Sequence, residues 1–242
     1  MAGNIYIGTS GWSYKHWMGT FYPIGTKQKD RFLYYQKFFN TVELNSPFYR
    51  LPPKETFEKW KGDVPDDFIY AVKASRFITH MKKLNDVADS LTRVLGNAAG
   101  LDEKLSIVLF QLPPNWEINI ERFKLFLEKL PQGNRYTFEF RNHTWYDPGI
   151  YNLLQQYNYA FCIYELAGHL SPLQVTANYV YIRLHGPGDK YQGSYSEAAL
   201  QEWANRCKAW AKENKDVYVY FDNDQEGFSA FNAIRLQELV SI

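Results

Sequence analysis

The chain has 242 residues, of which 45% are hydrophobic, 18% aromatic and 22% charged, and its formal net charge is +1 at pH 7. The apolar fraction is too high and the net charge too low for a disordered chain, and the near-neutral balance argues against a general polyanion binder. The length suits one α/β barrel of about 250 residues or two smaller domains.

Targeting and redox signals are few. The N-terminal segment has no basic n-region and no apolar h-region, and no apolar run approaches the ~18 residues of a membrane span. Cys162 and Cys207 lie far apart without a CxxC pattern, so we predict two buried free thiols rather than a disulfide or zinc site. We therefore expect a cytoplasmic protein without membrane contact.

Strand-like and helix-like runs alternate along the whole chain. The predicted strands are Ile5–Thr9, Thr41–Asn45, Phe68–Ala74, Leu105–Gln111, Tyr136–Arg141, Tyr159–Tyr164, Tyr179–His185 and Val217–Asn223. The predicted helices are Lys29–Phe39, Lys54–Lys61, Leu84–Ala99, Ile120–Leu130, Gly149–Gln156, Ser196–Glu213 and Phe228–Val240. Only the stretch from Glu165 to Asn178 lacks a clear helix.

About eight βα units in this length predict an α/β protein with parallel strands, a single (β/α)8 TIM barrel over residues 1–242. A doubly wound open sheet is the main alternative, and it usually carries a glycine fingerprint after its first strand. Here Gly8-Thr9-Ser10-Gly11-Trp12 matches neither a dinucleotide-binding loop, nor a Walker loop, nor the G-x-S-x-G turn of a hydrolase.

Polar residues gather at the C-terminal ends of the predicted strands, where barrel active sites lie. Strand alternation gives several of these strands one polar face, which would point into the lumen. Burying such charges costs several kcal/mol per ion unless they are paired, and a ligand or catalytic site is the usual reason for the cost. The alternative is a structural network, since three cations could balance three anions. The residues are Glu43, Asn45, Lys73, Gln111, Glu139, Arg141, Arg183, His185 and Asp222.

Each charged residue has two readings. Glu43 and Glu139 could form a general acid/base pair, or they could pair with Lys73 and Arg141. Lys73 suits a fixed positive charge better than a Schiff-base nucleophile. Arginines offer bidentate clamps for carboxylate or phosphate, so Arg141 and Arg183 favour an anionic or phosphorylated ligand.

No cofactor is predicted. The histidines form no close ligand pair, so a divalent metal would have to be assembled across strands from Glu43, Glu139, His185 and Asp222. Three nearby cations would compete with it. The glycine-rich segment 185–193 could present N–H groups to phosphate. The next loop, 222–227, is acidic, which argues against phosphate at that loop.

The aromatic residues divide between loops and strands. The first βα loop contains Trp12, Tyr14, Trp17, Phe21 and Tyr22, and Tyr49, Trp145 and Tyr191 fall in other loops. These rings could stack a sugar or a base, or they could pack into a small core of their own. We predict that the loop aromatics line the pocket and that the strand aromatics do not.

Several motifs, taken in order along the chain, resemble the YecE-like family, a domain-of-unknown-function family. They are Gly8-Thr9-Ser10-Gly11-Trp12-Ser13-Tyr14, Thr41-Val42-Glu43-Leu44-Asn45, Gln111-Leu112-Pro113-Pro114, Glu139-Phe140-Arg141 and Arg183-Leu184-His185-Gly186. The resemblance covers essentially the whole chain and implies a TIM-barrel fold similar to sugar-isomerase and abasic-site endonuclease barrels. It implies no particular activity.

We therefore expect an enzyme that acts by acid/base chemistry on a small polar, anionic or phosphorylated substrate. Glu43, Lys73, Glu139 and His185 are the candidate catalytic residues, with His185 as a proton shuttle or hydrogen-bond donor. The candidate substrate-binding residues are Trp12, Tyr14, Trp17, Asn45, Tyr49, His80, Gln111, Arg141, Trp145, Arg183, Tyr191 and Asn223. The alternatives are a nucleic-acid binding or phosphodiester-cleaving barrel and a non-catalytic ligand sensor.

Overall fold

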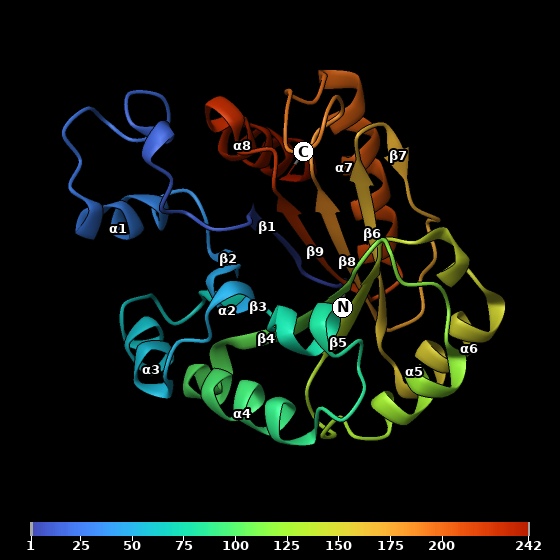
Figure 1. Ribbon diagram of the computed structural model, residues 1–242. Helices are drawn as coiled ribbons and strands as arrows, with labels where there is room; N and C mark the ends of the chain where they lie inside the picture. The colour runs from blue at the N-terminus through green and yellow to red at the C-terminus, as the bar shows by residue number, and fades with distance from the viewer. Residues whose placement is uncertain (1, 242) are drawn as a thin grey trace. The chain divides into compact units, whose positions relative to one another are not determined.

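The computed structural model describes residues 2–241 and divides into two compact units (Figure 1). Unit 1 comprises Met1–Glu43, Ile163–Leu173 and Asn178–Ile242, and unit 2 comprises Leu44–Cys162 and Gln174–Ala177. The prediction that all 242 residues form one domain stays a prediction.

Strands and helices alternate as the sequence predicts. The strands are β1 (Ile5–Thr9), β2 (Thr41–Leu44), β3 (Ile69–Lys73), β4 (Leu105–Leu112), β5 (Tyr136–Phe140), β6 (Ala160–Leu166), β7 (His169–Leu170), β8 (Tyr179–Leu184) and β9 (Asp216–Phe221). Their neighbour order is β1-β9-β8-β6-β5-β4-β3-β2, with β7 paired to β6 outside this path. Eight parallel strands in this order, with helices between them, confirm the predicted (β/α)8 fold class.

The helices follow the strands in the chain. The α-helices are α1 (Arg31–Tyr35), α2 (Ser46–Tyr49), α3 (Lys54–Gly62), α4 (Ala88–Ala98), α5 (Ile120–Leu127), α6 (Pro148–Tyr157), α7 (Glu197–Lys212) and α8 (Phe228–Ser241). A π-helical turn, η3, spans Phe77–Met81, and 3-10 turns span Lys15–Trp17 (η1), Gln28–Asp30 (η2), Ala99–Lys104 (η4), His143–Trp145 (η5) and Gln225–Gly227 (η6).

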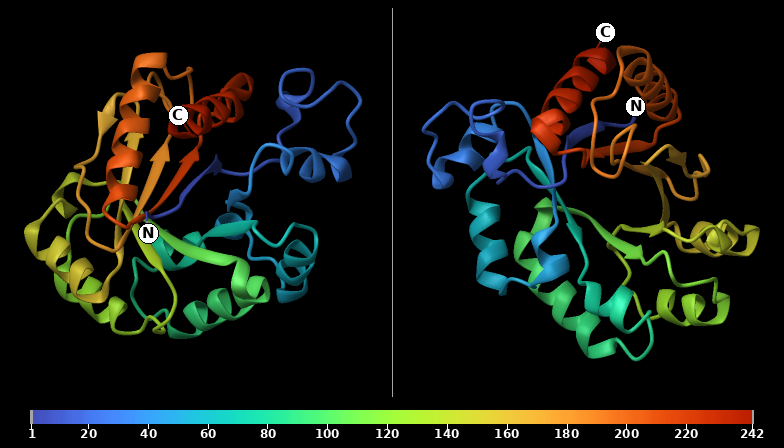
Figure 2. Two further views of the ribbon diagram at one scale, coloured as in Figure 1. Left: turned by 180° about the vertical axis from the view of Figure 1, so that it is seen from behind. Right: turned by 45° about the horizontal axis from the view of Figure 1, so that its top comes forward.

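Unit 1 has β9 between β1 and β8, both parallel to it. Helices α7 and α8 lie side by side against these strands (Figures 1 and 2). Gly8 marks a close approach of β1 to β2, because a Cβ atom there would lie 2.4 Å from the carbonyl oxygen of Thr41. An isolated parallel bridge also joins Ser10 to Glu43, which brings the ends of β1 and β2 together.

Unit 2 contains the parallel run β3-β4-β5 and the first residues of β6. Phe110 of β4 and Phe138 of β5 stack on one face, and Phe126 of α5 packs edge-on against both. This apolar face fixes which residues point the other way. The register pairs Lys73 with Leu109 and Gln111 with Glu139, so these side chains share the opposite face.

Two predicted helices are shorter than expected. Helix α4 starts at Ala88 rather than Leu84, because Leu84 and Asp86 have φ angles of +62° and +47°, which a right-handed helix cannot contain. The helix expected over residues 29–39 is reduced to η2 and α1. The stretch predicted to lack a helix carries the β6–β7 hairpin, whose turn residues Ala167 and Gly168 both have positive φ, as a two-residue hairpin requires.

The predictions for the cysteines are confirmed, since Cys162 and Cys207 are both buried and free. Within residues 2–241, no helix has the length and apolar character needed to cross a membrane.

Candidate functional site

A buried ion pair between Glu43 and Arg183 is the centre of the polar residues in unit 1. Both side chains are 0% exposed. The guanidinium meets the carboxylate along one edge, with Nε 2.9 Å from Oε2 and Nη2 2.7 Å from Oε1. Ser10 Oγ donates to Oε1 at 2.5 Å, and the Tyr181 hydroxyl donates to Oε2 at 2.6 Å. Burial raises the pKa of Tyr181 well above its usual value, so the phenol remains a donor.

These four donors occupy the acceptor positions of the Glu43 carboxylate, which has about four lone-pair sites. Glu43 therefore has no free acceptor for a substrate proton. The acid/base role predicted for Glu43 would require one of these bonds to break. Its partner is Arg183, not Lys73 or Arg141 as the sequence alternatives proposed.

His185 and Asp222 lie at the edge of this network. Arg183 Nη1 lies 3.3 Å from His185 Nε2, and an arginine N–H can only donate. His185 Nε2 must then be an acceptor, which places the proton on Nδ1, 3.0 Å from Asp222 Oδ2. Asp222 also accepts from Arg183 Nη2 at 3.2 Å. The Asp222 side chain is 13% exposed, whereas His185 and Arg183 are 0% exposed, so water reaches the network at Asp222.

Tyr14, from the first βα loop, bonds to the same region. Its hydroxyl donates to the carbonyl oxygen of Ser10. Burial raises the pKa of Tyr14, and the carboxylates of Asp222, Asp224 and Glu43 raise it further. Tyr14 is thus a protonated phenol that fixes the backbone beside Glu43.

Unit 2 holds a second group of charges. Glu139 is 0% exposed, and its carboxylate accepts from Nε of Arg141, whose side chain is 7% exposed. Lys73 is buried at the end of β3, and its ammonium lies 4.2 Å from the centre of the Phe48 ring. Two cations and one anion therefore occupy the C-terminal ends of β3 and β5.

The pKa of His80, a residue of η3, depends on the charges that surround it in unit 2. Burial, the largest cause, and the positive charges of Lys73, Arg76 and Arg141 together lower the pKa of His80 to about 4, against the opposing effect of Glu139. Its Nδ1 lies 2.9 Å from Thr79 Oγ1, and its ring packs edge-on against Phe48. The imidazole is therefore neutral at pH 7.

Two amide side chains complete the polar end of unit 2. Asn45 follows β2 directly, and its Oδ1 is buried without a hydrogen-bond partner among the described residues. An unsatisfied buried acceptor costs about 1–3 kcal/mol unless a water or a ligand reaches it. Gln111 is partly exposed beside Glu139 in the register of β4 and β5.

The predicted rim of loop aromatics is only partly present. Trp17 is fully buried between Phe21 and Tyr22, so this part of the first loop is a small core. Trp145 is also fully buried, its ring stacked on Phe140 and its N–H donating to the Trp116 carbonyl oxygen. Neither indole has a face available to a ligand, because both are surrounded by other side chains of their own unit.

The remaining predicted aromatics are more accessible. Tyr49 is 70% exposed and Tyr191 is 42% exposed. Trp12 is partly exposed and stacks on Phe32. Among the strand aromatics, Tyr181 belongs to the buried polar network, since its hydroxyl donates to Glu43. Strand alternation already places Tyr181 on the face of Arg183, so the period of two carried the missing signal.

Asn223 has a supporting position. Its Nδ2 donates to the Gly193 carbonyl oxygen at 2.8 Å and to Asn232 Oδ1 at 2.9 Å. These bonds hold the loop after β8 to α8. Gly186 begins this loop with a φ of +106°, and a Cβ atom there would lie 2.2 Å from the Gln192 carbonyl oxygen, so no other residue fits.

A pocket of about 970 Å³ opens beside this loop in unit 1. It is lined by His16, Thr20, Lys190, Tyr191, Gln192, Asp224, Gln225, Glu226 and Phe228. Tyr191 also packs edge-on against His185, which connects the pocket wall to the buried network. His16 Nε2 lies 3.4 Å from Asp224 Oδ2, and burial raises the pKa of Asp224.

No group of three or more His, Cys, Asp or Glu side chains in residues 2–241 is arranged to hold a metal ion. The four residues that the sequence suggested for a metal site do not form one group. Glu43, His185 and Asp222 are hydrogen-bonded in the network around Arg183, whereas Glu139 pairs with Arg141. A guanidinium already occupies the acceptor side of each group.

A family model described as "Protein of unknown function DUF72" matches residues 6–242. The UPF0759 protein YunF of Bacillus subtilis is 28% identical over an alignment of 276 positions, which covers 98% of this chain and 95% of YunF. The UPF0759 protein YecE of Escherichia coli is also 28% identical, over 146 residues that cover 60% of this chain and 51% of YecE.

Solved structures give the same result. A DUF72 family protein from Thermotoga maritima has a TM-score of 0.90 at 26% identity, with 99% of this chain and 100% of that chain covered. A DUF72 family protein from Enterococcus faecalis has a TM-score of 0.83 at 20% identity, covering 98% of this chain and 96% of that chain. This second likeness concerns the fold alone.

Proposed function

Because the chain belongs to the DUF72 family of proteins of unknown function, we propose its activity from its own side chains. It is an enzyme that binds the anionic group of a small polar substrate with Lys73 and Arg141 and moves a proton with Glu139 or His80. The observation that carries this proposal is the face shared by β3, β4 and β5 in unit 2. Lys73 and Glu139 lie on this face at the C-terminal ends of parallel strands, and Arg141 pairs with Glu139. Active sites of this fold class lie at those ends.

The anion-binding role rests on the charges. Arg141 places a guanidinium, the group best suited to a carboxylate or phosphate, beside Glu139, to which its Nε donates. The position of the Lys73 ammonium over the Phe48 ring stabilises the charged form, which supports a fixed charge over a Schiff-base nucleophile. Oδ1 of Asn45 has no hydrogen-bond partner among the described residues, and rotation of this side chain toward solvent would let it accept from a substrate hydroxyl or amine.

The proton-transfer role rests on His80 and Glu139. With a pKa of about 4, free His80 is a weak base at pH 7. An anion beside Lys73 and Arg141 would cancel the positive field that lowers this pKa, and the imidazole would become a stronger base when substrate binds. Glu139, buried beside Arg141, is the second candidate.

A pH titration of the His80 imidazole by NMR, with and without inorganic phosphate, tests the binding step. Phosphate should raise the pKa of His80 from about 4 toward the ordinary value of about 6.5. Lys73→Met should raise the pKa without phosphate and weaken phosphate binding about tenfold or more, since a charge-assisted hydrogen bond contributes about 1.5–3 kcal/mol. Lys82→Met is the matched control, because Lys82 is exposed and directly follows η3. It should change neither the pKa of His80 nor the affinity for phosphate.

Turnover tests the catalytic step. Phosphorylated and carboxylated small molecules that compete with phosphate are incubated with the protein, and conversion is followed by NMR. Glu139→Gln should remove conversion while phosphate still binds. If phosphate does not change the pKa of His80, the proposed anion-binding site is wrong. Tight binding without any conversion would instead make the protein a ligand sensor.

The phosphodiester-cleaving alternative depends on aromatic loops that stack bases. The burial of Trp17 and Trp145 removes two of the rings it needs, which favours a small substrate. An oligonucleotide that binds with a steep dependence on salt would favour the alternative.

A further inference from the structure

Besides the pocket in unit 1, a pocket of about 890 Å³ lies in unit 2, and none of the residues of the proposed site lines it. It lies between the loop that precedes α3, the loop after β3 and one side of α4. Its walls are formed by Arg50, Leu51, Pro53, Lys54, Glu55, Ser75, Phe77, Ile78, Ser90, Arg93, Val94 and Asn97. Its volume falls within the range of about 300–1,000 Å³ that is typical of small-molecule sites.

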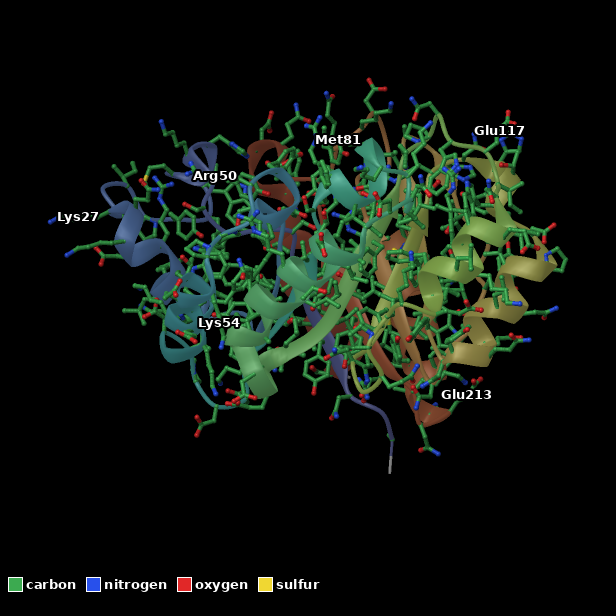
Figure 3. The ribbon with its side chains drawn as sticks, turned by 60° about the horizontal axis from the view of Figure 1, so that its bottom comes forward. Lys27, Arg50, Lys54, Met81, Glu117 and Glu213 are labelled. Carbon is green, nitrogen blue, oxygen red and sulfur yellow. The ribbon has the colours of Figure 1, made fainter. Side chains whose placement is uncertain are left out.

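The charges around this pocket do not balance. Arg50, Lys54 and Arg93 face a single acidic wall residue, Glu55. Among the described residues, no carboxylate lies within 4.0 Å of either guanidinium, whereas Lys54 forms an exposed pair with Glu58 at 3.6 Å. Figure 3 labels both Arg50 and Lys54, and Lys54 is the first residue of α3. Two arginines without partners at one pocket leave their donor forks available to an anion.

The nearby sequence adds to this positive potential. From Phe68 to Asn85 the chain contains Lys73, Arg76, Lys82 and Lys83 and no acidic residue. This run includes the pocket wall at Ser75 and Phe77. A concave surface with an excess of one charge raises the local concentration of the opposite ion.

The rest of the wall gives the pocket a fixed shape and an apolar part. Asn97 Nδ2 donates to the Pro52 carbonyl oxygen at 2.8 Å, which ties the loop before α3 to α4. Ile78 and Val94 are buried beneath the pocket, and the Phe77 ring is 39% exposed. A ligand here would meet an aromatic and aliphatic surface beside the arginines.

We propose that this pocket binds a small molecule with two anionic groups and an apolar or planar part, held by Arg50 and Arg93 with Lys54 and packed against Phe77. This goes beyond the proposed function, because none of Lys73, His80, Glu139 or Arg141 lines the pocket. The site would serve a second substrate or an effector. The two arginines, without a carboxylate partner within residues 2–241, match the two anionic ends of a pyrophosphate or dicarboxylate group.

Pyrophosphate is the probe, and calorimetry at low and at physiological salt measures its affinity. Arg50→Gln and Arg93→Gln should each weaken binding about tenfold or more. Arg93→Lys, which keeps the charge and loses the fork, should lie between Arg93→Gln and the unchanged protein. Arg122→Gln is the matched control, since Arg122 lies over Trp116 in the same unit and outside the pocket. These arginines are at the surface, so folding should be retained, and circular dichroism checks it.

The His80 signal separates the two sites. If Arg93→Gln loses pyrophosphate affinity while phosphate still shifts His80, the pocket is a distinct site. Failure of the Lys73 experiment would leave this result unchanged. Equal losses in Arg122→Gln and Arg93→Gln would show diffuse charge attraction and overturn the proposal. A single-stranded oligonucleotide that displaces pyrophosphate with a steep salt slope would replace the small ligand with nucleic acid.

Discussion

Removing one hydroxyl from each of two neighbouring tyrosines tests whether the Glu43 carboxylate is held as a buried ion. Tyr181 and Tyr220 lie on β8 and β9 with ring centres 5.3 Å apart, and both are 0% exposed. The Tyr181 hydroxyl donates to Glu43 Oε2 at 2.6 Å, whereas the Tyr220 hydroxyl shares a hydrogen bond of 2.7 Å with Thr41 Oγ1. The two sites differ mainly in the charge of the partner.

A buried hydrogen bond to a charged group contributes about 1.5–3 kcal/mol, and a neutral one about 0.5–1.5 kcal/mol. Tyr181→Phe and Tyr220→Phe remove the same atom from equally buried rings, so the packing terms largely cancel. In Tyr181→Phe, Ser10 and Arg183 still bind the Glu43 carboxylate, so we expect this variant to lose about 1.5–2 kcal/mol of the free energy of unfolding. We expect Tyr220→Phe to cost about 1 kcal/mol less.

Urea unfolding at pH 7, followed by tryptophan fluorescence and by circular dichroism, measures both losses. Because the chain has two compact units, the two probes must give the same transition before one free energy of unfolding is assigned. An equal or smaller loss for Tyr181→Phe would refute the view that Glu43 is an ionised acceptor at the centre of the network.

Three further predictions concern buried groups. Glu43→Ala should lower the free energy of unfolding by about 3 kcal/mol or more, because Arg183 stays buried after losing its main carboxylate partner and keeps Asp222. Adding Arg183→Met should recover part of the lost stability, and an equal loss in the double variant would contradict the pairing. Stability should fall above pH 10, by about 1.4 kcal/mol per pH unit for each buried tyrosine such as Tyr35, because burial raises the folded-state pKa and only the unfolded chain releases the proton there. Exposed tyrosines such as Tyr49 ionise before unfolding, so the buried ones should add a second rise in tyrosinate absorbance together with unfolding; ionisation of all 19 tyrosines in the folded protein would oppose this. Burial raises the pKa of Cys207 to about 12, so the folded protein should resist alkylation at pH 8 until urea is added, and rapid labelling without urea would count against it.

At acid pH, the stability of the protein should depend on His80. Because the folded pKa of His80 is about 4 and the unfolded value is about 6.5, the stability linked to His80 is present above pH 6.5 and is lost as the pH falls toward 4. Lys73→Met should reduce this acid sensitivity, since one cause of the low pKa is removed. The free energy of unfolding, measured at several pH values in both proteins, checks it; an unchanged slope would contradict the assignment of the field to Lys73.

Several features follow from the sequence alone because they depend on local periodicity. The alternation of strand-like and helix-like runs predicts the (β/α)8 fold class. The period of two places Glu139 and Arg141 on one face of the strand predicted over residues 136–141, and Tyr181 and Arg183 on one face of β8. These relations need only the pleat of a strand. The collection of charges at strand ends likewise follows from the chain itself.

Only the tertiary structure decides how those charges are paired. The sequence supplies three cations and three anions, and it allows Glu43 to pair with Lys73 or Arg141. In the structure, Arg183 takes Glu43 and Asp222 in unit 1, and Arg141 takes Glu139 in unit 2. Ion pairing depends on distances of a few ångströms between strands remote in the chain, and no local pattern encodes them.

The aromatic residues show the same division. Composition and loop position cannot distinguish Trp145, which is enclosed by Phe140 and Trp116, from Tyr49, which is exposed. Both are large rings that follow a strand, and each gains free energy by leaving water. Which ring finds a cavity of matching shape is decided by side-chain packing from several elements, and this packing exists only after the chain has folded.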